Sequence, residues 1–139
     1  MKRHMAGLAA LALCCFVGTS LAARADVTDK EINEKIVGKW NEEFEENGIK
    51  VKVTLNYKKD GVLEAEGTVD ANGMTINIKV TGKWKAENGA LVETYEKSEP
   101  EGLIPAGKTT TDKVLSIDDK THTIKTEEGK ERKRTRIEK

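Results

Sequence analysis

Two glutamates lie at positions where strand alternation predicts side chains that point into an apolar interior. Glu42 and Glu93 each alternate with large apolar residues, which are Trp40, Phe44, Leu91 and Tyr95. Residues two apart in a strand share one face, and an unpaired carboxylate is costly to bury. Acids in such a place can accept hydrogen bonds in a pocket, or they can meet a basic or amine-bearing ligand.

Two structural explanations for the glutamates stay open. Both carboxylates could lie at a solvated rim, or Lys113 could neutralise one of them. Hydrolysis by the pair Glu42 and Glu93 is a further and weaker option. The rest of the chain offers little for catalysis, because it has two histidines and two cysteines in all.

The histidines and cysteines predict a protein that is not an enzyme. His4, Cys14 and Cys15 lie in an N-terminal segment that we expect to be removed, which leaves His122 and no thiol. One histidine without a cysteine offers no Cys–His couple and no zinc set. We expect His122 to be a solvated residue of a strand between threonines, and we expect no metal and no cofactor.

Positions 1–25 are typical of an export signal. Lys2 and Arg3 precede an apolar run that is too short to span a bilayer as a helix, and Ala23 and Ala25 suit a cleavage before Asp26. We therefore expect a signal peptide over 1–25, a single domain over 26–139, no membrane span, and a periplasmic or extracellular location.

The charge balance argues against a nucleic-acid binder. The whole chain has 24 basic and 24 acidic residues, and positions 1–25 contain three basic residues and no acid, so the remainder carries a small negative charge. Proteins that bind nucleic acid are normally strongly basic. The ten C-terminal residues are rich in Lys and Arg, and we interpret them as the solvated outer face of a strand, with contact to an anionic surface as the alternative.

Alternating apolar residues predict the elements that position these groups. Isoleucine, valine, leucine and tyrosine occupy every second position over 49–57, and a similar pattern covers 74–84. Turn residues such as Asn47-Gly48 separate the strands. We predict a helix over 29–36, begun by a capping box at Thr28 and Glu31, and eight strands at 39–46, 49–57, 63–69, 74–85, 90–97, 108–117, 121–126 and 130–138. An all-β, antiparallel, up-and-down barrel of eight strands with a short N-terminal helix follows.

Gly38-Lys39-Trp40, after a short helix and at the start of the first of eight strands, resembles the lipocalin or calycin superfamily, and in particular small bacterial secreted lipocalin-like domains. The resemblance covers 36–139. It implies that Trp40 packs across one end of the barrel and that an arginine of the last strand stacks on it. Arg136 is the arginine we expect there, with Gly38, Trp40 and Arg136 as structural residues.

The expected function is sequestration or transport of a small apolar or amphipathic molecule in the barrel. The predicted pocket consists of Phe44, Val53, Leu55, Ala65, Ile76, Ile78 and Tyr95, with Glu42 and Glu93. Small inward residues at Ala65 and Gly67 would leave room for a ligand, unless Trp84, Tyr57 or Met74 fills it. The alternative is a protein-interaction module with a solid core that uses the loop 98–107, which carries both prolines together with Leu103 and Ile104. That loop could equally tuck over the barrel opening.

Overall fold

Eight antiparallel strands follow one another in chain order and close into a barrel, as the alternation predicted. A computed structural model describes residues 26–137, so the predicted signal peptide at 1–25 lies outside the described residues. The elements are α1 (Asp29–Lys35), β1 (Gly38–Glu46), β2 (Ile49–Tyr57), β3 (Val62–Ala71), β4 (Met74–Glu87), β5 (Ala90–Glu99), β6 (Thr109–Ile117), β7 (Thr121–Lys125) and β8 (Glu131–Arg136). Within the described part, the helix is too short and too polar to span a bilayer.

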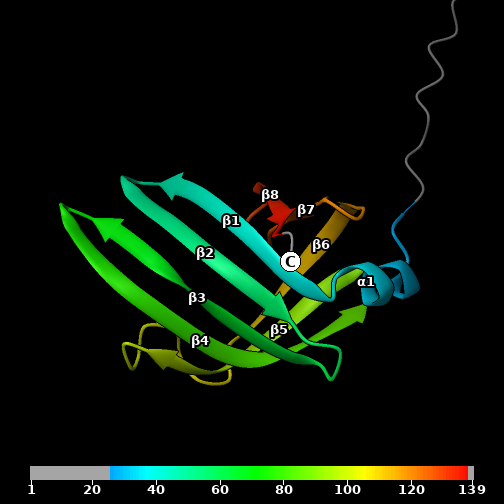
Figure 1. The fold of residues 1–139 in the computed structure, drawn as a ribbon, viewed down its shortest axis with the longest axis horizontal. Helices are drawn as coiled ribbons and strands as arrows, with labels where there is room; N and C mark the ends of the chain where they lie inside the picture. Colours follow the sequence, from blue (N-terminus) through cyan, green and yellow to red (C-terminus); the bar gives the residue numbers. More distant parts are fainter. Residues whose placement is uncertain (1–25, 138–139) are drawn as a thin grey trace, which may run out of the picture.

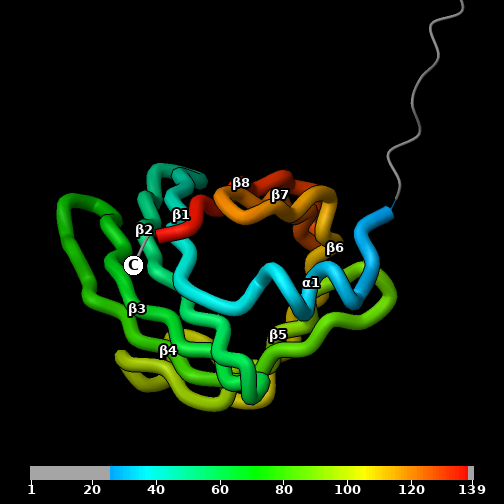
Figure 2. The backbone as a smooth tube through the Cα atoms, turned by 45° about the vertical axis from the view of Figure 1, so that its right-hand side comes forward, coloured from blue at the N-terminus to red at the C-terminus, as the bar shows by residue number. Residues whose placement is uncertain are grey.

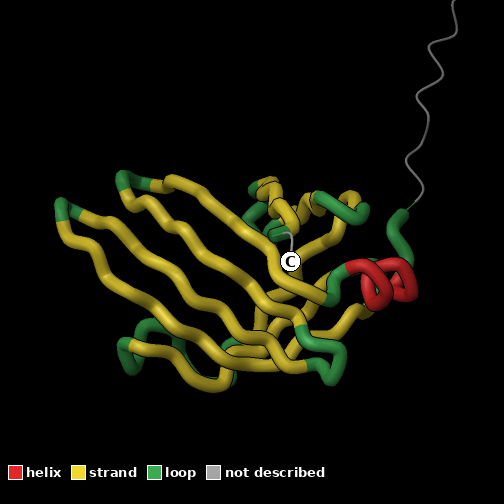
Figure 3. The backbone as a smooth tube through the Cα atoms, viewed as in Figure 1, coloured by secondary structure: helices red, strands yellow, loops and turns green. Residues whose placement is uncertain are grey.

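The barrel has two different ends. The helix α1 lies at one end, which we call the helix end, and Figure 1 shows the β1–β2 and β3–β4 turns at the other, which we call the open end. Figure 2 shows the backbone from a second direction, with the strands arranged around a ring. Loops at both ends connect the strands (Figure 3). Successive strands run in opposite directions between the two ends, so side chains from strands far apart in the chain meet inside the barrel.

Asparagine residues at the strand connections fix the register of the hairpins. Asn47 and Gly48 have φ values of 53° and 77°, and Asn72 and Asn88 lie in the same left-handed region. Two consecutive residues of positive φ form the tight turn whose twist matches that of the flanking strands. The register Phe44↔Val51 that results places apolar residues of β1 and β2 on one face.

The helix α1 is held to the barrel at both of its ends. Thr28 and Glu31 form the predicted capping box. Asp29 accepts hydrogen bonds from the backbone N–H groups of Asn88 and Gly89 in the β4–β5 turn, at 3.1 and 2.7 Å. The predicted helix is thus confirmed, one residue shorter than expected at its C-terminus.

A compact apolar plug fills the helix end. Its buried side chains come from the helix, its C-cap and seven strands: Ile32, Ile36, Trp40, Tyr57, Leu63, Trp84, Leu91, Val114 and Ile124. The indole N–H of Trp40 donates to the carbonyl of Ile36 at 2.7 Å, and the rings of Tyr57 and Trp84 meet edge to face with centroids 5.8 Å apart. Aromatic side chains of this size supply most of the buried apolar area in so small a domain.

Arg136 closes the barrel where the first and last strands meet. β1 and β8 share only two residue pairs, Trp40↔Arg136 and Asn41↔Thr135. The guanidinium of Arg136 lies 4.2 Å from the ring centre of Trp40, so the stacking expected from the resemblance is present. Its N–H groups donate to the carbonyls of Asp119, Val37 and Lys35. A Cβ at residue 38 would lie 2.6 Å from Nη1 of Arg136, which explains Gly38.

Replacing Arg136 by lysine should destabilise the protein. The lysine ammonium group keeps the charge, but it cannot stack flat on the Trp40 ring or donate to three carbonyls in the fixed planar geometry of a guanidinium. We expect Arg136→Lys to lower the free energy of unfolding by about 2 kcal/mol in urea denaturation. Lys133→Ala, at an exposed position of the same strand, serves as the control and should change it by less than about 0.5 kcal/mol. Equal stability of the two variants would contradict the role assigned to Arg136.

Candidate functional site

A cavity of about 380 Å³ occupies the open half of the barrel, beyond the apolar plug. Its walls are formed by apolar side chains of β1 to β5. Ile104, Lys108, Thr126, Glu127 and Glu128 come from the loops at the open end and surround its mouth. The plug of Trp84 and Tyr57 stops short of this region, so the aromatic residues do not fill the whole barrel.

Most of the predicted pocket residues line this cavity. Phe44, Val53, Leu55, Ala65, Ile78, Tyr95, Glu42 and Glu93 all contribute to its surface. Ile76 does not, and it is 37% exposed. The prediction for Ile76 was wrong because β4 pairs with β5 only from Lys79 onward, so the end of the β3–β4 hairpin projects past the barrel wall.

Gly67 is small for a reason that alternation did not reveal. A Cβ at residue 67 would lie 1.9 Å from the backbone carbonyl of Lys52 in β2. Glycine therefore permits the close approach of two strands, and Gly67 is not among the residues that line the cavity. Ala65 alone provides the expected small inward side chain at the cavity wall.

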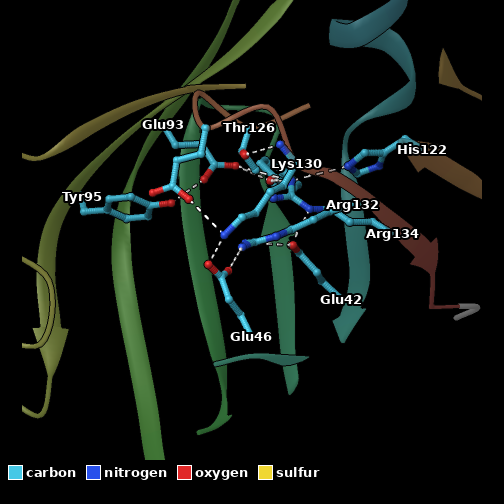
Figure 4. Close-up of polar contacts among 11 residues, drawn as sticks. Glu42, Glu46, Glu93, Tyr95, His122, Thr126, Lys130, Arg132 and Arg134 are labelled. Atoms are coloured by element: carbon cyan, nitrogen blue, oxygen red, sulfur yellow. Dashed lines mark hydrogen bonds and ion pairs between the residues drawn. The ribbon is translucent and has the colours of Figure 1, made fainter. Parts of the chain in front are cut away.

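The floor of the cavity is a network of charged and hydroxyl groups around Arg134 (Figure 4). The guanidinium of Arg134 is 4% exposed, donates to Glu42 Oε2 at 2.6 Å and to the hydroxyl of Tyr57 at 2.6 Å, and lies 3.6 Å from Glu93 Oε1. Adjacent acids raise the pKa of Arg134 against the opposing effect of burial. The arginine stays charged, and it joins groups from four strands.

Both predicted glutamates point inward and both are paired. Glu93 accepts hydrogen bonds from the hydroxyls of Tyr57 and of Tyr95, the latter at 2.7 Å. Burial, and with it the charge of Glu93, raises the pKa of each tyrosine, so the hydroxyls remain donors. Neither glutamate lies at a solvated rim, since Glu42 is 3% and Glu93 1% exposed.

Lys113 does not neutralise either glutamate. Its side chain points outward, is 62% exposed and lies 4.0 Å from Asp26. In β6 the inward positions are Thr110, Asp112 and Val114, so the expectation for Lys113 was out by one residue. The counter-charge comes instead from β8.

The basic last strand is not simply a solvated outer face. Arg132, Arg134 and Arg136 occupy alternate positions and all turn inward, while Lys133 is exposed. Arg132 stacks over the ring of Phe44 at 3.7 Å and lies 3.4 Å from Glu46 and 3.7 Å from Glu42. The spacing Arg-x-Arg-x-Arg could have predicted these inward positions. Residues two apart in a strand share one face, so one inward arginine implies that the other two also point inward.

His122 is buried rather than solvated, which corrects the prediction. It is fully inaccessible, its ring meets Trp40 edge to face at 4.3 Å, and its Nε2 lies 3.5 Å from Nη1 of Arg134. Burial, together with the charges of Arg134 and Arg136, lowers the pKa of His122 to about 3. The imidazole is therefore neutral and belongs to the plug.

Asp112 is the site residue that the sequence analysis missed. It lines the cavity, is 8% exposed, and forms neither an ion pair nor a side-chain hydrogen bond within residues 26–137. Burial and the charge of Glu93 raise the pKa of Asp112 to about 6, with smaller effects from Glu42 and Glu127. Asp112 could be identified only from the structure, which shows which residues of β6 point into the barrel.

The loop after β5 partly covers the cavity mouth. Ile104 packs against the core and lines the cavity, whereas Leu103 is 44% exposed. The hydroxyl of Ser98 accepts from the backbone N–H of Ile104 at 3.2 Å and holds the loop inward. One of the two predicted aliphatic residues therefore tucks over the opening and the other remains free for contact.

Over residues 26–137 no group of three or more His, Cys, Asp and Glu side chains is arranged to hold a metal ion. Comparison with protein-family models gave no match, and comparison with curated proteins gave no similar sequence.

The buried state of Asp112 predicts a gain in stability on its replacement. Its carboxyl has a pKa of about 6 in the fold against 3.8 as its ordinary value, so the folded chain gains stability as pH falls through this range. Asp112→Asn removes the charge, and we expect it to stabilise the protein by about 1–3 kcal/mol at pH 7.5. The difference in stability between the variant and the wild type should become smaller towards pH 4, because Asp112 is then protonated in the folded wild type. Asp119→Asn, at an exposed position, should show neither effect in thermal or urea unfolding.

His122 predicts a loss of stability in acid. The unfolded chain takes up a proton near pH 6.5 while the folded chain does so near pH 3, so stability falls between these values. Compared with His122→Phe, which keeps a ring against Trp40, the wild type should lose about 3 kcal/mol more between pH 7 and pH 4. Parallel curves for the two proteins in urea titrations would show that the histidine is not held neutral.

Proposed function

We propose that this protein binds a small amphipathic molecule non-covalently in the open half of its barrel. The observation that carries the proposal is the cavity of about 380 Å³ that has apolar walls and a charged floor. Ligand sites in proteins commonly measure about 300–1,000 Å³ and combine apolar walls with a few fixed polar groups. The proposed role is non-enzymatic sequestration or transport.

The walls would supply most of the affinity. Val53 and Leu55 of β2 and Ile78 of β4 line the cavity, and Phe44 of β1 adds to the same apolar surface. Each Å² of apolar surface that leaves water contributes about 25 cal/mol. An alkyl or aryl group of a ligand can gain this contribution without any rearrangement of the barrel.

The floor would supply orientation. Arg134 already donates hydrogen bonds to Glu42 and Tyr57, and Glu93 already accepts them from Tyr57 and Tyr95. A polar network of fixed geometry costs little to order when a ligand binds. The polar group of an amphipathic molecule would therefore face the floor and its apolar part the walls.

The fold is compatible with the lipocalin-like resemblance, and we propose that the chain is an exported member of that group, acting in the periplasm or outside the cell.

A protein-interaction role is the second candidate. Ile49, Met74 and Ile76 are exposed at the end of the projecting hairpins, and Leu103 is exposed on the loop beside the mouth, where a protein partner could contact them. The cavity favours the ligand-binding role, because a barrel used only as a scaffold has no need of a hollow interior.

Filling the cavity should weaken binding of a neutral probe. We expect the fluorescence of N-phenyl-1-naphthylamine to increase saturably on addition of the wild-type protein. Val53→Phe and then Val53→Trp should weaken binding stepwise, by about tenfold for tryptophan, because the new ring occupies the probe's place. Lys52→Trp, on the outer face of the same strand, should leave binding within about twofold.

Two results would contradict the proposed function. One is the absence of saturable binding by a folded wild-type protein, together with no retained small molecule in native mass spectrometry of protein purified from its own host. The other is equal loss of binding in Lys52→Trp and Val53→Trp, which would place the probe on the outer surface.

A further inference from the structure

We infer that the ligand carries a protonated amine and that this cation pairs with Asp112 beside the floor of the cavity. The inference rests on the proposed function and specifies the class of molecule that the cavity takes. It follows from the charges that line the cavity, from the hydrogen bonds that these groups do and do not make, and from the position of Asp112.

The buried acids outnumber the buried cations. Glu42, Glu93 and Asp112 are each more than nine-tenths buried, while Arg134 is the only comparably buried cation among the residues described. Arg132 is partly exposed, and the exposed Lys108 lies at the mouth of the cavity. Buried charges are normally paired. Of the three buried acids, Asp112 alone forms no ion pair within residues 26–137.

The unpaired charge is assigned to Asp112. Glu42 pairs with Arg134 and Arg132, and Glu93 receives hydrogen bonds from two tyrosines. No side chain of the described structure donates to Asp112. A carboxylate kept in this state carries a cost of desolvation that the charge of Arg134 offsets only in part, and it lines the space that a ligand would fill.

The groups around Asp112 favour a cation over an anion. Glu93 of β5, Glu42 of β1 and Glu127 of the β7–β8 turn raise the pKa of Asp112, and Arg134 of β8 lowers it. Arg132 of β8 and Lys108 at the mouth are the other cations that line the cavity. His122 of β7 is neutral. An anionic ligand would add another negative charge to this set, whereas an ammonium group balances it.

The unused acceptors suit the donors of an ammonium group. Thr110 lies two residues from Asp112 on the inward face of β6, and its buried hydroxyl has no hydrogen-bond partner. Glu42 Oε1, which lies 3.7 Å from Nη1 of Arg132, is also buried and accepts no hydrogen bond. An ammonium group has three donors and no acceptor, so it can satisfy the carboxylate of Asp112 and further acceptors of the floor.

Three probes with one alkyl chain and different polar groups test the inference: octylamine, octanol and octanoate, titrated by isothermal calorimetry at pH 7.5. We expect octylammonium to bind best. Asp112→Asn should weaken octylammonium by about thirtyfold, the size of effect seen when one partner of a buried charge pair is removed. The affinity for octanol should change by less than about twofold, since its contacts with the apolar walls remain. The control Asp119→Asn, which changes the net charge equally, should leave all three affinities unaltered.

The pH dependence provides a second readout. Asp112 ionises with a pKa of about 6, so the affinity of the wild type for octylammonium should rise about tenfold between pH 5 and pH 7. Octanol should show no such rise, and Asp112→Asn should abolish it. Thr110→Val, which keeps the shape of the side chain, should weaken octylammonium by about threefold through loss of one acceptor.

The outcomes separate this inference from the proposed function. Equal binding of octanol and octylammonium, unaffected by Asp112→Asn, would overturn the amine while the cavity remained a binding site. Tightest binding of octanoate would also overturn it and would assign the polar group of the ligand to Arg134 or Arg132. If the octyl probes and N-phenyl-1-naphthylamine all fail to bind, the proposed function fails and the inference with it.

Discussion

The contact of Arg134 with Glu42, Glu93 and Tyr57 is the interaction on which the rest of this structure depends. It joins the last strand to β1, β2 and β5 across the interior. The backbone ladder between β1 and β8 has only two residue pairs, so side chains supply much of what holds this seam together. Arg134 also lies at the boundary between the apolar plug and the cavity, and so divides the barrel into a filled half and a hollow half.

A buried ion pair of this kind does not by itself make a protein stable. The desolvation of the charges offsets most of their attraction, and well-packed apolar residues often serve stability equally well. What the network provides is a fixed arrangement, because each member accepts or donates to another and a change of one leaves its partners unsatisfied. Asp112 stands outside this arrangement. Its carboxylate forms no ion pair within the described residues, and its raised pKa means that the charged form lowers stability at neutral pH.

Much of the fold could be predicted from alternation and turn chemistry, and much of the site could not. The Asn-Gly turns and the alternating segments, clearest in 49–57 and 74–84, predict a meander of eight strands, and the contact of Trp40 with Arg136 was expected from the resemblance to lipocalin-like domains. It was harder to predict which residues of the polar strands point inward. β6 and β8 contain few apolar residues, so nothing in their sequence says whether Asp112 or Lys113 points inward. The position of Ile76 depended on how far β5 extends, which is a property of its neighbour and not of its own strand.

The projecting end of β4 has a consequence for the flexibility of the open end. From Met74 to Ile78 the strand pairs with β3 alone, because β5 departs after Glu99. A ribbon of two strands bends and twists far more easily than a sheet that is bonded on both sides. The tip of the β3–β4 hairpin is therefore the part of the barrel wall at the open end that bends with the least loss of backbone hydrogen bonds.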